Sequence, residues 1–160
     1  RLSASEIVAM LDEVFTRFDQ LASKQRLEKI KTIGDAYLAV GGLPSPREDH
    51  AEAIADLALA MMADIDEMFA RKQLPMQLRI GIDTGPVIAG VIGKQKFTYD
   101  LWGDTVNTAS RMESSGEPGR IQVSERVHCR LPDGYSFEER GTIEVKGKGA
   151  MKTWWLEGRC

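Results

Sequence analysis

The sequence predicts a single α+β domain over residues 1–160, an α/β sandwich in which a ferredoxin-like βαββαβ core carries a C-terminal strand–helix–hairpin extension. Three observations lead to this fold class. Two long segments place apolar residues at helical spacing, and several short segments read as strands separated by glycine-containing turns. In addition, a chain of this length buries roughly 70% of its unfolded surface when it folds, which is enough for one core.

The first predicted helix begins at the capping box of Ser3 and Glu6, whose side chains each accept from the backbone N–H of the other residue. Because this helix starts at the third residue, we expect that the first core strand is missing and that the domain is N-terminally truncated. Residues 27–32 and 36–40 predict two strands, and the tight turn at residues 34–35 joins them as a hairpin.

A second capping box, at Asp49 and Glu52, opens a long helix that continues to about residue 72. Beyond it the pattern becomes mostly strand-like. The remaining predicted elements are strands at 77–84, 87–93 and 97–102, a helix with Asp104 as its N-cap, a strand at 121–123, a short helix at 124–128, and a hairpin of residues 137–145 and 152–157.

Composition excludes several classes of protein. Apolar residues make up 42% of the chain and charged residues 28%, as in ordinary globular domains. The net charge of −3 gives no reason to expect a nucleic-acid partner. Two cysteines are too few for a disulfide framework and indicate a reducing compartment. The most apolar stretch, residues 53–65, is interrupted by Asp56 and Asp64, so we expect no membrane contact by this domain. The free cysteines favour a cytoplasmic domain, a placement compatible with a membrane-tethered parent protein.

Asn107 and Arg111 are four residues apart on the helix predicted after Asp104, so their side chains project from one face. An amide and a guanidinium fork near a helix N-terminus suit a phosphorylated ligand, because both donate hydrogen bonds to anionic oxygens. The alternative is a solvated helix face on which Arg111 pairs with Glu113 or Glu117.

Three other charged residues suit phosphate or metal binding. Asp35 is expected at a hairpin tip, where an exposed carboxylate can bind Mg²⁺ together with substrate phosphates, although aspartate is also a common turn residue. Lys31 interrupts the apolar part of its strand, and Lys146 lies in a Lys-Gly-Lys-Gly turn that suits a polyphosphate end. Solvated lysines at such positions are equally ordinary.

Four blocks of sequence occur in one order: residues 28–37, 79–87, 99–113 and 145–149. Together they resemble the catalytic domain of class III nucleotidyl cyclases, of the adenylate cyclase type, over nearly the whole chain. The resemblance implies an enzyme of intracellular signalling that converts ATP to 3′,5′-cyclic AMP and pyrophosphate.

The resemblance also implies roles for individual residues. Asp35 resembles the second of two carboxylates that hold two divalent cations, Mg²⁺ or Mn²⁺, and the first would lie on the missing strand. Asn107 resembles the residue that orients the ribose, and Arg111 the one that stabilises the pentacoordinate phosphorus. Lys146 resembles the contact to the terminal phosphates.

Lys31 and Asp100 match the pair that reads the adenine edge in adenylate cyclases, where guanylate cyclases typically carry Glu and Cys. The chemistry agrees, because a lysine donates to adenine N1 and a carboxylate accepts from the N6 amine. Guanine presents a donor at N1 and an acceptor at O6, so both hydrogen bonds would be mismatched, and a site built for hydrogen bonds rejects such an analogue.

In the family, each active site lies between two catalytic domains, so the resemblance implies a head-to-tail homodimer. The metal carboxylates would come from one copy and the remaining site residues from the other, across a two-fold interface. The alternative from another class is a catalytically silent nucleotide-binding or regulatory domain, which the missing strand would favour. A guanylate cyclase is the less favoured alternative among enzymes.

Overall fold

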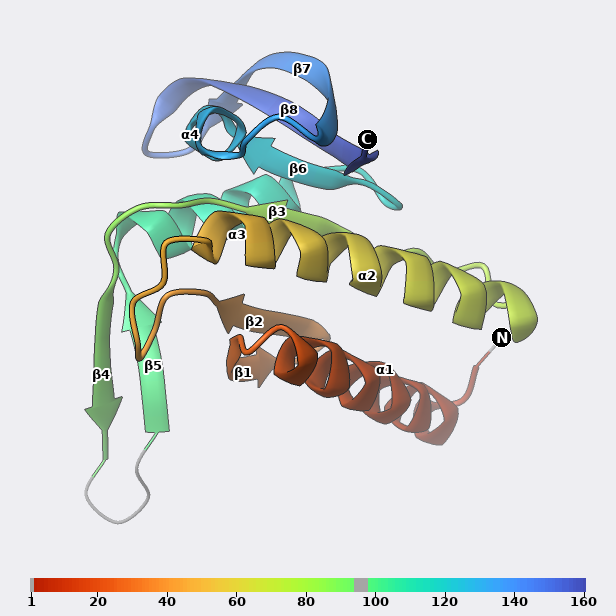
Figure 1. Ribbon diagram of the computed structural model, residues 1–160. Coiled ribbons are helices and arrows are strands. Elements are labelled where there is room, and N and C mark those ends of the chain that lie inside the picture. Colours follow the sequence, from red (N-terminus) through yellow and green to blue (C-terminus); the bar gives the residue numbers. More distant parts are fainter. Residues whose placement is uncertain (1, 94–97) are drawn as a thin grey trace. The chain divides into compact units, whose positions relative to one another are not determined.

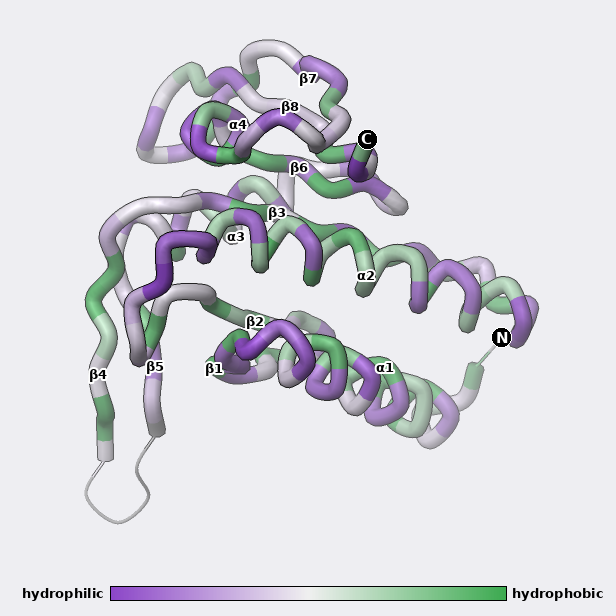
Figure 2. Tube along the Cα trace, in the orientation of Figure 1, coloured by the Kyte–Doolittle hydropathy of each residue, from purple (hydrophilic) through white to green (hydrophobic). Residues whose placement is uncertain are grey.

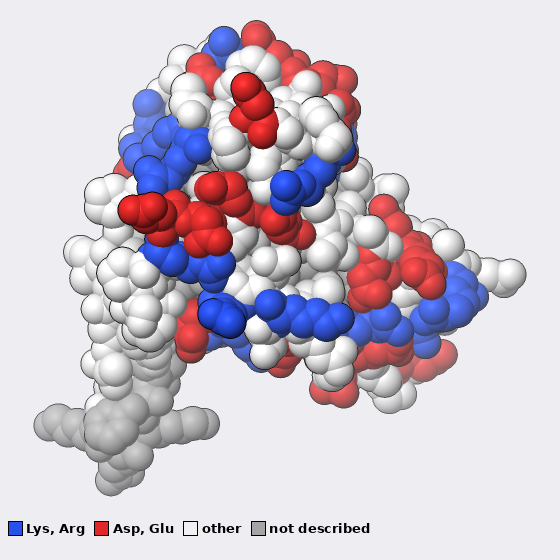
Figure 3. Space-filling model, viewed as in Figure 1, with Lys and Arg blue, Asp and Glu red and all other residues white. Residues whose placement is uncertain are grey.

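The structure is a computed structural model that describes residues 2–93 and 98–160, and it divides into two compact units, residues 1–61 and 62–160 (Figure 1). One helix, α2 (His50–Arg71), runs from the first unit into the second. Among the helices of the described ranges, none combines the length and apolar character that crossing a membrane requires. Acidic and basic side chains are interspersed over the face shown in Figure 3.

The first unit begins with α1 (Ala4–Lys24), and the predicted capping box is confirmed, with Ser3 as N-cap and Glu6 accepting from its backbone. Apolar and polar residues alternate along α1 at helical spacing, as Figure 2 shows. Phe18 is buried, and its ring packs edge-on against Tyr37 at 5.3 Å between centroids. The Tyr37 hydroxyl donates to Asp19 Oδ1 at 2.7 Å, which ties the hairpin that follows to α1.

The predicted hairpin is also confirmed, as β1 (Glu28–Ile33) and β2 (Ala36–Val40) pair antiparallel around Gly34, whose φ of +58° a glycine adopts at low cost. The register shifts by one residue between Lys29 and Lys31, which is a β-bulge that periodicity did not predict. Bulges redirect the side chains that follow them and are over-represented beside functional sites. This bulge immediately precedes Lys31.

The long second helix, α2, is confirmed within two residues of its predicted ends. Both oxygens of the predicted cap residue Asp49 accept from the Arg47 guanidinium, at 2.7 and 3.0 Å. This pair holds the pKa of the Asp49 carboxyl below its usual range. Of the apolar residues predicted to form the buried face of α2, Ile54 is half-buried and the others are buried: Ala51, Leu57, Ala58, Met61, Ile65, Met68 and Phe69.

The second unit is built on a four-stranded sheet in the order β3-β6-β8-β7, in which β3 and β6 are parallel and the other neighbours antiparallel. A separate two-stranded ribbon, β4–β5, leaves this sheet between β3 and α3 (Figure 1). The bounds are β3 (Ile80–Ile82), β4 (Ile88–Ile92), β5 (Thr98–Trp102), α3 (Asp104–Ser114), β6 (Ile121–Ser124), α4 (Glu125–Arg130), β7 (Tyr135–Val145) and β8 (Gly149–Arg159). The strand predicted at residues 77–84 is therefore shorter than expected.

The α+β class is confirmed, although the expected core sheet is present in separate pieces. The β1–β2 hairpin forms a sheet of its own, and β3 pairs with β6. In a complete βαββαβ sheet, the first strand pairs with both the third and the fourth, which here are β2 and β3. The described residues that precede α1 form no strand.

Candidate active site on helix α3

Helix α3 follows β5 directly and begins differently from the prediction. Gly103 is the N-cap, with a φ of +122°, and no side chain caps the helix. Asp104 is instead the first helical residue, so its prediction as N-cap was wrong. The reason is that its carboxylate accepts from the Lys148 ammonium at 2.5 Å and remains outside the helix end.

The exposed face of α3 carries the two predicted phosphate-site residues. Asn107 and Arg111 are both exposed, whereas Thr105, Thr108 and Met112 are buried on the opposite face. Among the described residues, Arg111 forms no ion pair. The alternative in which it pairs with Glu113 is therefore not realised, because Glu113 accepts from Arg79 Nε at 2.5 Å. The guanidinium of Arg111 remains available to an anion.

The helix lies directly on the backbone of β3, because the strand has a glycine at the point of closest approach. A Cβ at Gly81 would lie only 2.1 Å from Glu113 N and 2.6 Å from Ala109 O. Any side chain there would push α3 away from the sheet, so Gly81 sets the depth at which Asn107 and Arg111 are held.

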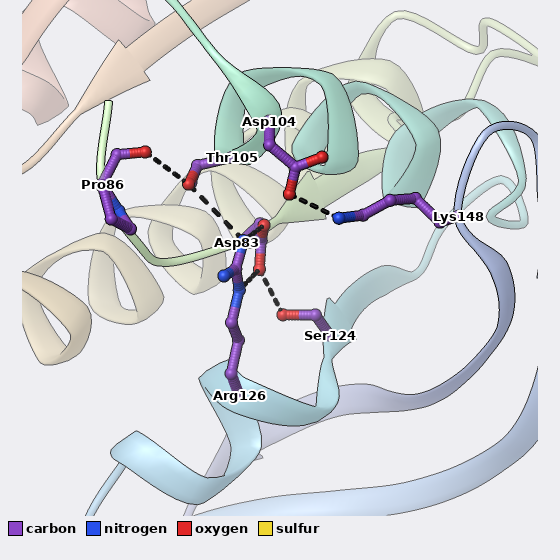
Figure 4. A network of polar contacts seen from close by, with 7 residues as sticks. All are labelled: Asp83, Pro86, Asp104, Thr105, Ser124, Arg126 and Lys148. Atoms are coloured by element: carbon purple, nitrogen blue, oxygen red, sulfur yellow. Dashed lines mark hydrogen bonds and ion pairs between the residues drawn. The ribbon is translucent and has the colours of Figure 1, made fainter. Parts of the chain in front are cut away.

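A polar network holds the N-terminal end of α3 (Figure 4). The Asp83 carboxylate has no exposed surface, accepts from Ser124 Oγ at 2.6 Å and Arg126 Nε at 2.8 Å, and has a second contact with Arg126 Nη2. Arg126 Nη2 also lies 3.5 Å from Thr105 Oγ1, which donates to Pro86 O at 2.7 Å. The hydrogen bond that Arg126 donates to Asp83 is the main cause of the raised pKa of the Arg126 guanidinium.

A second network holds the C-terminal end. Gln122 on β6 is fully buried, and its amide nitrogen donates to Met112 O at 2.8 Å and Ser115 Oγ at 3.0 Å. Its amide oxygen accepts from Arg140 Nη1 at 2.7 Å and Thr153 Oγ1 at 2.9 Å. Since every polar atom of this amide has partners, the end of α3 is fixed to β6, β7 and β8.

Lys146 is exposed in the turn between β7 and β8, as predicted for a residue that contacts phosphates. The ion pair between Lys148, in the same turn, and Asp104 brings this turn to the first turn of α3 (Figure 4). Arg111 lies about 10 Å further along the helix axis, given 1.5 Å per residue. The structure thus brings the lysine turn and the α3 face into one region of the second unit.

Asp100 lies on β5 and is 7% exposed. One of its carboxylate oxygens accepts from the backbone N–H of Leu101 at 2.7 Å. Opposite Asp100 on β4 is Gly90, which presents no side chain to it. Asp100 is therefore a buried carboxylate on the strand that leads into α3.

Lys31 and Asp35 belong to the first unit. Lys31 is half-buried on β1, directly after the bulge, and Asp35 is exposed in the hairpin turn. Among the described residues, the Asp35 carboxylate makes no hydrogen bond or ion pair. An exposed, unengaged carboxylate at a tight turn fits a ligand of a hard divalent cation, which takes one or two carboxylates together with substrate phosphates.

Sequence reasoning missed the residues that hold α3 in place: Gly81, Asp83, Gln122 and Arg126. The one available signal was the polar Asp83 at the end of an apolar strand. Its partner Arg126 is 43 residues away in the sequence, a separation that no periodicity reports.

Comparison with known proteins gives a family context for this geometry. The family model for the adenylate and guanylate cyclase catalytic domain matches residues 1–158. An adenylate cyclase of Mycobacterium tuberculosis is 49% identical over 155 residues, covering 97% of this chain and 35% of that protein. The guanylate cyclase soluble subunit beta-2 of Rattus norvegicus is 48% identical over 153 residues, covering 94% of this chain and 22% of that protein.

Solved structures of both kinds of cyclase are similar as well. The adenylyl cyclase CyaB from P. aeruginosa has a TM-score of 0.92 at 26% identity, covering all of this chain and 86% of that one. The guanylate cyclase domain of RhGC from Catenaria anguillulae, solved with GTP, has a TM-score of 0.87 at 36% identity, covering 100% and 88%. A rhodopsin-guanylyl cyclase core with converted specificity, solved with ATPαS, has a TM-score of 0.86 at 37% identity, covering 99% and 86%.

Proposed function

This chain belongs to the family of class III adenylate and guanylate cyclase catalytic domains, and we propose that it converts ATP to 3′,5′-cyclic AMP and pyrophosphate. The observation that carries the proposal is the ion pair between Lys148 and Asp104, which holds the β7–β8 turn beside α3. Two cationic side chains, Lys146 and Arg111, then face solvent in the region where a triphosphate would bind.

In the proposed reaction, the ribose 3′-oxygen attacks the α-phosphorus in line. A bond from O3′ to phosphorus forms while the bond from phosphorus to the bridging oxygen breaks. Pyrophosphate leaves with that electron pair, and the hydroxyl proton passes to solvent. Such phosphoryl chemistry needs positioning and charge neutralisation more than covalent help.

The side chains divide this work. Asn107 orients the ribose, and Lys146 binds the terminal phosphates. Arg111 donates to the oxygens of the α-phosphorus, where charge develops in the transition state, and one such donor is worth roughly 3–4 kcal/mol. The two networks at the ends of α3 keep the Asn107–Arg111 face rigid, so little reorganisation is required during the reaction.

Asp35 would hold the divalent cations, Mg²⁺ or Mn²⁺, together with the substrate phosphates. When bound, these ions neutralise the charge on the attacking and leaving oxygens. The family resemblance assigns the first of the two metal-binding carboxylates to a strand before α1. A version of the chain that also includes such a strand and its carboxylate is therefore expected to bind metal more tightly.

Lys31 and Asp100 are the basis for proposing ATP rather than GTP as the substrate. The chain's relatives include both adenylate and guanylate cyclases at nearly equal identity, so similarity alone favours neither base. The hydrogen-bonding character of a lysine and a carboxylate matches the adenine edge and opposes that of guanine.

We also propose a head-to-tail homodimer, with active sites completed by both copies. The β4–β5 ribbon supports it, because it carries large exposed apolar side chains: Ile88 (67% exposed), Val91 (59%), Ile92 (50%) and Trp102 (40%). Such a concentration of exposed apolar side chains marks an association surface. Sedimentation of Ile88→Asp should show a shift toward monomer, whereas Val8→Asp, a similarly exposed valine outside the ribbon, should leave the mass unchanged.

The function is tested by incubating the chain with Mn²⁺ and either ATP or GTP, then quantifying cyclic nucleotide and pyrophosphate. Cyclic AMP should exceed cyclic GMP, and Arg111→Ala should lower its formation by about 100-fold or more, whereas the exposed Arg130→Ala should not. Lys31→Glu combined with Asp100→Cys should shift the preference toward GTP. Cyclic GMP as the main product would identify a guanylate cyclase. If neither nucleotide gives a product, even in a version of the chain that includes a strand before α1, the silent regulatory domain is supported.

A further inference from the structure

Helix α4 carries a cluster of potential metal ligands that has no part in the proposed cyclisation. Glu125 is followed at three and four residues by His128 and Cys129, so the carboxylate neighbours both other side chains on the helix surface. One ligand atom from each residue lies within 4.8 Å of the other two. Cys129 is a free, exposed thiol.

The His128 imidazole is held in place by aromatic packing. Its ring stacks on Trp154, with centroids 3.7 Å apart and planes at 4°, and meets the edge of Phe137 at 4.7 Å. A ring fixed on two sides presents its nitrogens in one direction, which is the preorganisation that a metal ligand requires.

Within the described part of the chain, the buried Nδ1 of His128 has no hydrogen-bond partner. The atom that faces it is Glu125 Oε1, at 3.6 Å. This separation is too long for a hydrogen bond. It is, however, about the spacing of two ligands that share one metal with bonds of about 2.0–2.1 Å. A cation between them would satisfy both lone pairs.

The neighbourhood of Glu125 also has the features of a supported ligand. Its Oε1 accepts from Trp154 Nε1 at 2.7 Å, which orients the carboxylate as outer hydrogen bonds orient metal ligands. Glu125 and Cys129 line the same surface hollow, so an ion can reach them from solvent. The ammonium of Lys152 lies 3.8 Å from Glu125 Oε2 and 3.6 Å from Glu139 Oε1, so Glu139 offers it another partner when a metal binds.

We propose that Glu125, His128 and Cys129 form a binding site for a zinc-class divalent transition metal, with a fourth position open to water. Imidazole and thiolate ligands favour Zn²⁺ or Co²⁺ over Mg²⁺, so this site differs in chemistry from the hard-cation ligand Asp35. It is also independent of the cyclase proposal, since none of its residues is assigned to nucleotide binding.

The test is a titration of the reduced chain with Co²⁺, followed by the thiolate-to-cobalt charge-transfer absorption and by displacement with Zn²⁺. One Co²⁺ per chain should produce this band, and Zn²⁺ should remove it. Cys129→Ser should abolish the band and His128→Gln should weaken Co²⁺ binding at least about tenfold. The chain offers matched controls, because its other cysteine and histidine lie elsewhere: Cys160→Ser and His50→Gln should leave the titration unchanged, as should Asp35→Asn.

Circular dichroism of each variant establishes that it is folded. If folded Cys129→Ser retains the band, or if Cys160→Ser removes it, the thiolate ligand is not Cys129 and the proposal is overturned. Absence of any thiolate-to-cobalt band in the unmodified chain would overturn it as well. None of these three results would bear on cyclic AMP formation, which is measured separately.

Discussion

The ammonium of Lys148 lies 2.5 Å from the carboxylate of Asp104, and this one contact joins the β7–β8 turn to the first turn of α3. Both side chains are partly exposed, at 35% and 56%. Such a pair contributes at most about 1 kcal/mol to stability. Its larger consequence is positional, since it brings Lys146 to the helix that carries Asn107 and Arg111.

Lys148→Met should therefore affect substrate binding more than folding. We expect the KM for ATP to rise several-fold, because the freed turn no longer holds Lys146 near the phosphates, with a free energy of unfolding within about 1 kcal/mol of the original. Steady-state kinetics and urea unfolding measure the two quantities. Lys152→Met removes a similarly exposed cation that does not contact α3 and should leave KM unchanged. An unaltered KM in Lys148→Met would contradict the positional role.

The ion pair of Asp83 and Arg126 should respond asymmetrically to substitution. The Asp83 side chain has no exposed surface, whereas that of Arg126 is 44% exposed. Arg126→Met leaves a buried carboxylate with Ser124 as its remaining partner in this network and should cost about 3 kcal/mol. Asp83→Asn leaves a guanidinium that can turn to water and should cost about 1 kcal/mol. Urea denaturation of both variants measures the difference, and equal costs would show that the buried charge is not the dominant factor.

Gly81→Ala should destabilise the second unit and impair catalysis together. The added Cβ would overlap the backbone of α3 at Glu113 and Ala109, so the helix must shift, at a cost of about 1–3 kcal/mol. The midpoint temperature of thermal unfolding and kcat are both expected to fall. Gly158→Ala is the matched control, because nothing lies within 4 Å of a Cβ at that position. If the two alanine variants have the same unfolding midpoint and kcat, the inference that α3 lies against the backbone of β3 is wrong.

Gln122→Leu should be costly although leucine is apolar and of similar size. The substitution removes the hydrogen bonds that Gln122 makes with Met112 O and with the Thr153 hydroxyl. Each buried polar group left unpaired costs about 1–3 kcal/mol. We expect a lower denaturation midpoint with an unchanged m-value. Gln20→Leu, on the exposed side of α1, should change the midpoint little. A neutral Gln122→Leu would mean that water replaces the lost partners.

Stability at alkaline pH should depend on Tyr37. Burial, together with the hydrogen bond to Asp19, raises the pKa of its phenol above the ordinary value of about 10. The folded state therefore retains this proton at pH values where the unfolded state begins to lose it. The contribution of Tyr37 to the free energy of unfolding is therefore fully present below pH 10 and is lost as the pH rises above it. Tyr37→Phe should flatten this decline in pH-dependent urea denaturation, whereas Tyr99→Phe, in the other unit, should not.

The elements that depend on neighbours in the chain could be predicted from the sequence alone. The α1 capping box joins residues three apart, and the β1–β2 hairpin turns at Gly34 because glycine tolerates the positive φ there. The order of four motifs was likewise sufficient to indicate the cyclase family and to nominate Asn107 and Arg111. Local preference misplaced the N-cap of α3 at Asp104, because the ion pair with Lys148 engages that carboxylate.

Tertiary structure alone decided how α3 is held. Asp83 meets Ser124 and Arg126 across more than 40 residues of sequence, and Gly81 admits the backbone of a helix that begins 23 residues later. The stacking of His128 on Trp154, beside Glu125, is likewise a contact between residues far apart in the sequence. Short-range periodicity reports which face of an element is apolar, whereas a buried polar contact is chosen by the partner that folding brings to it.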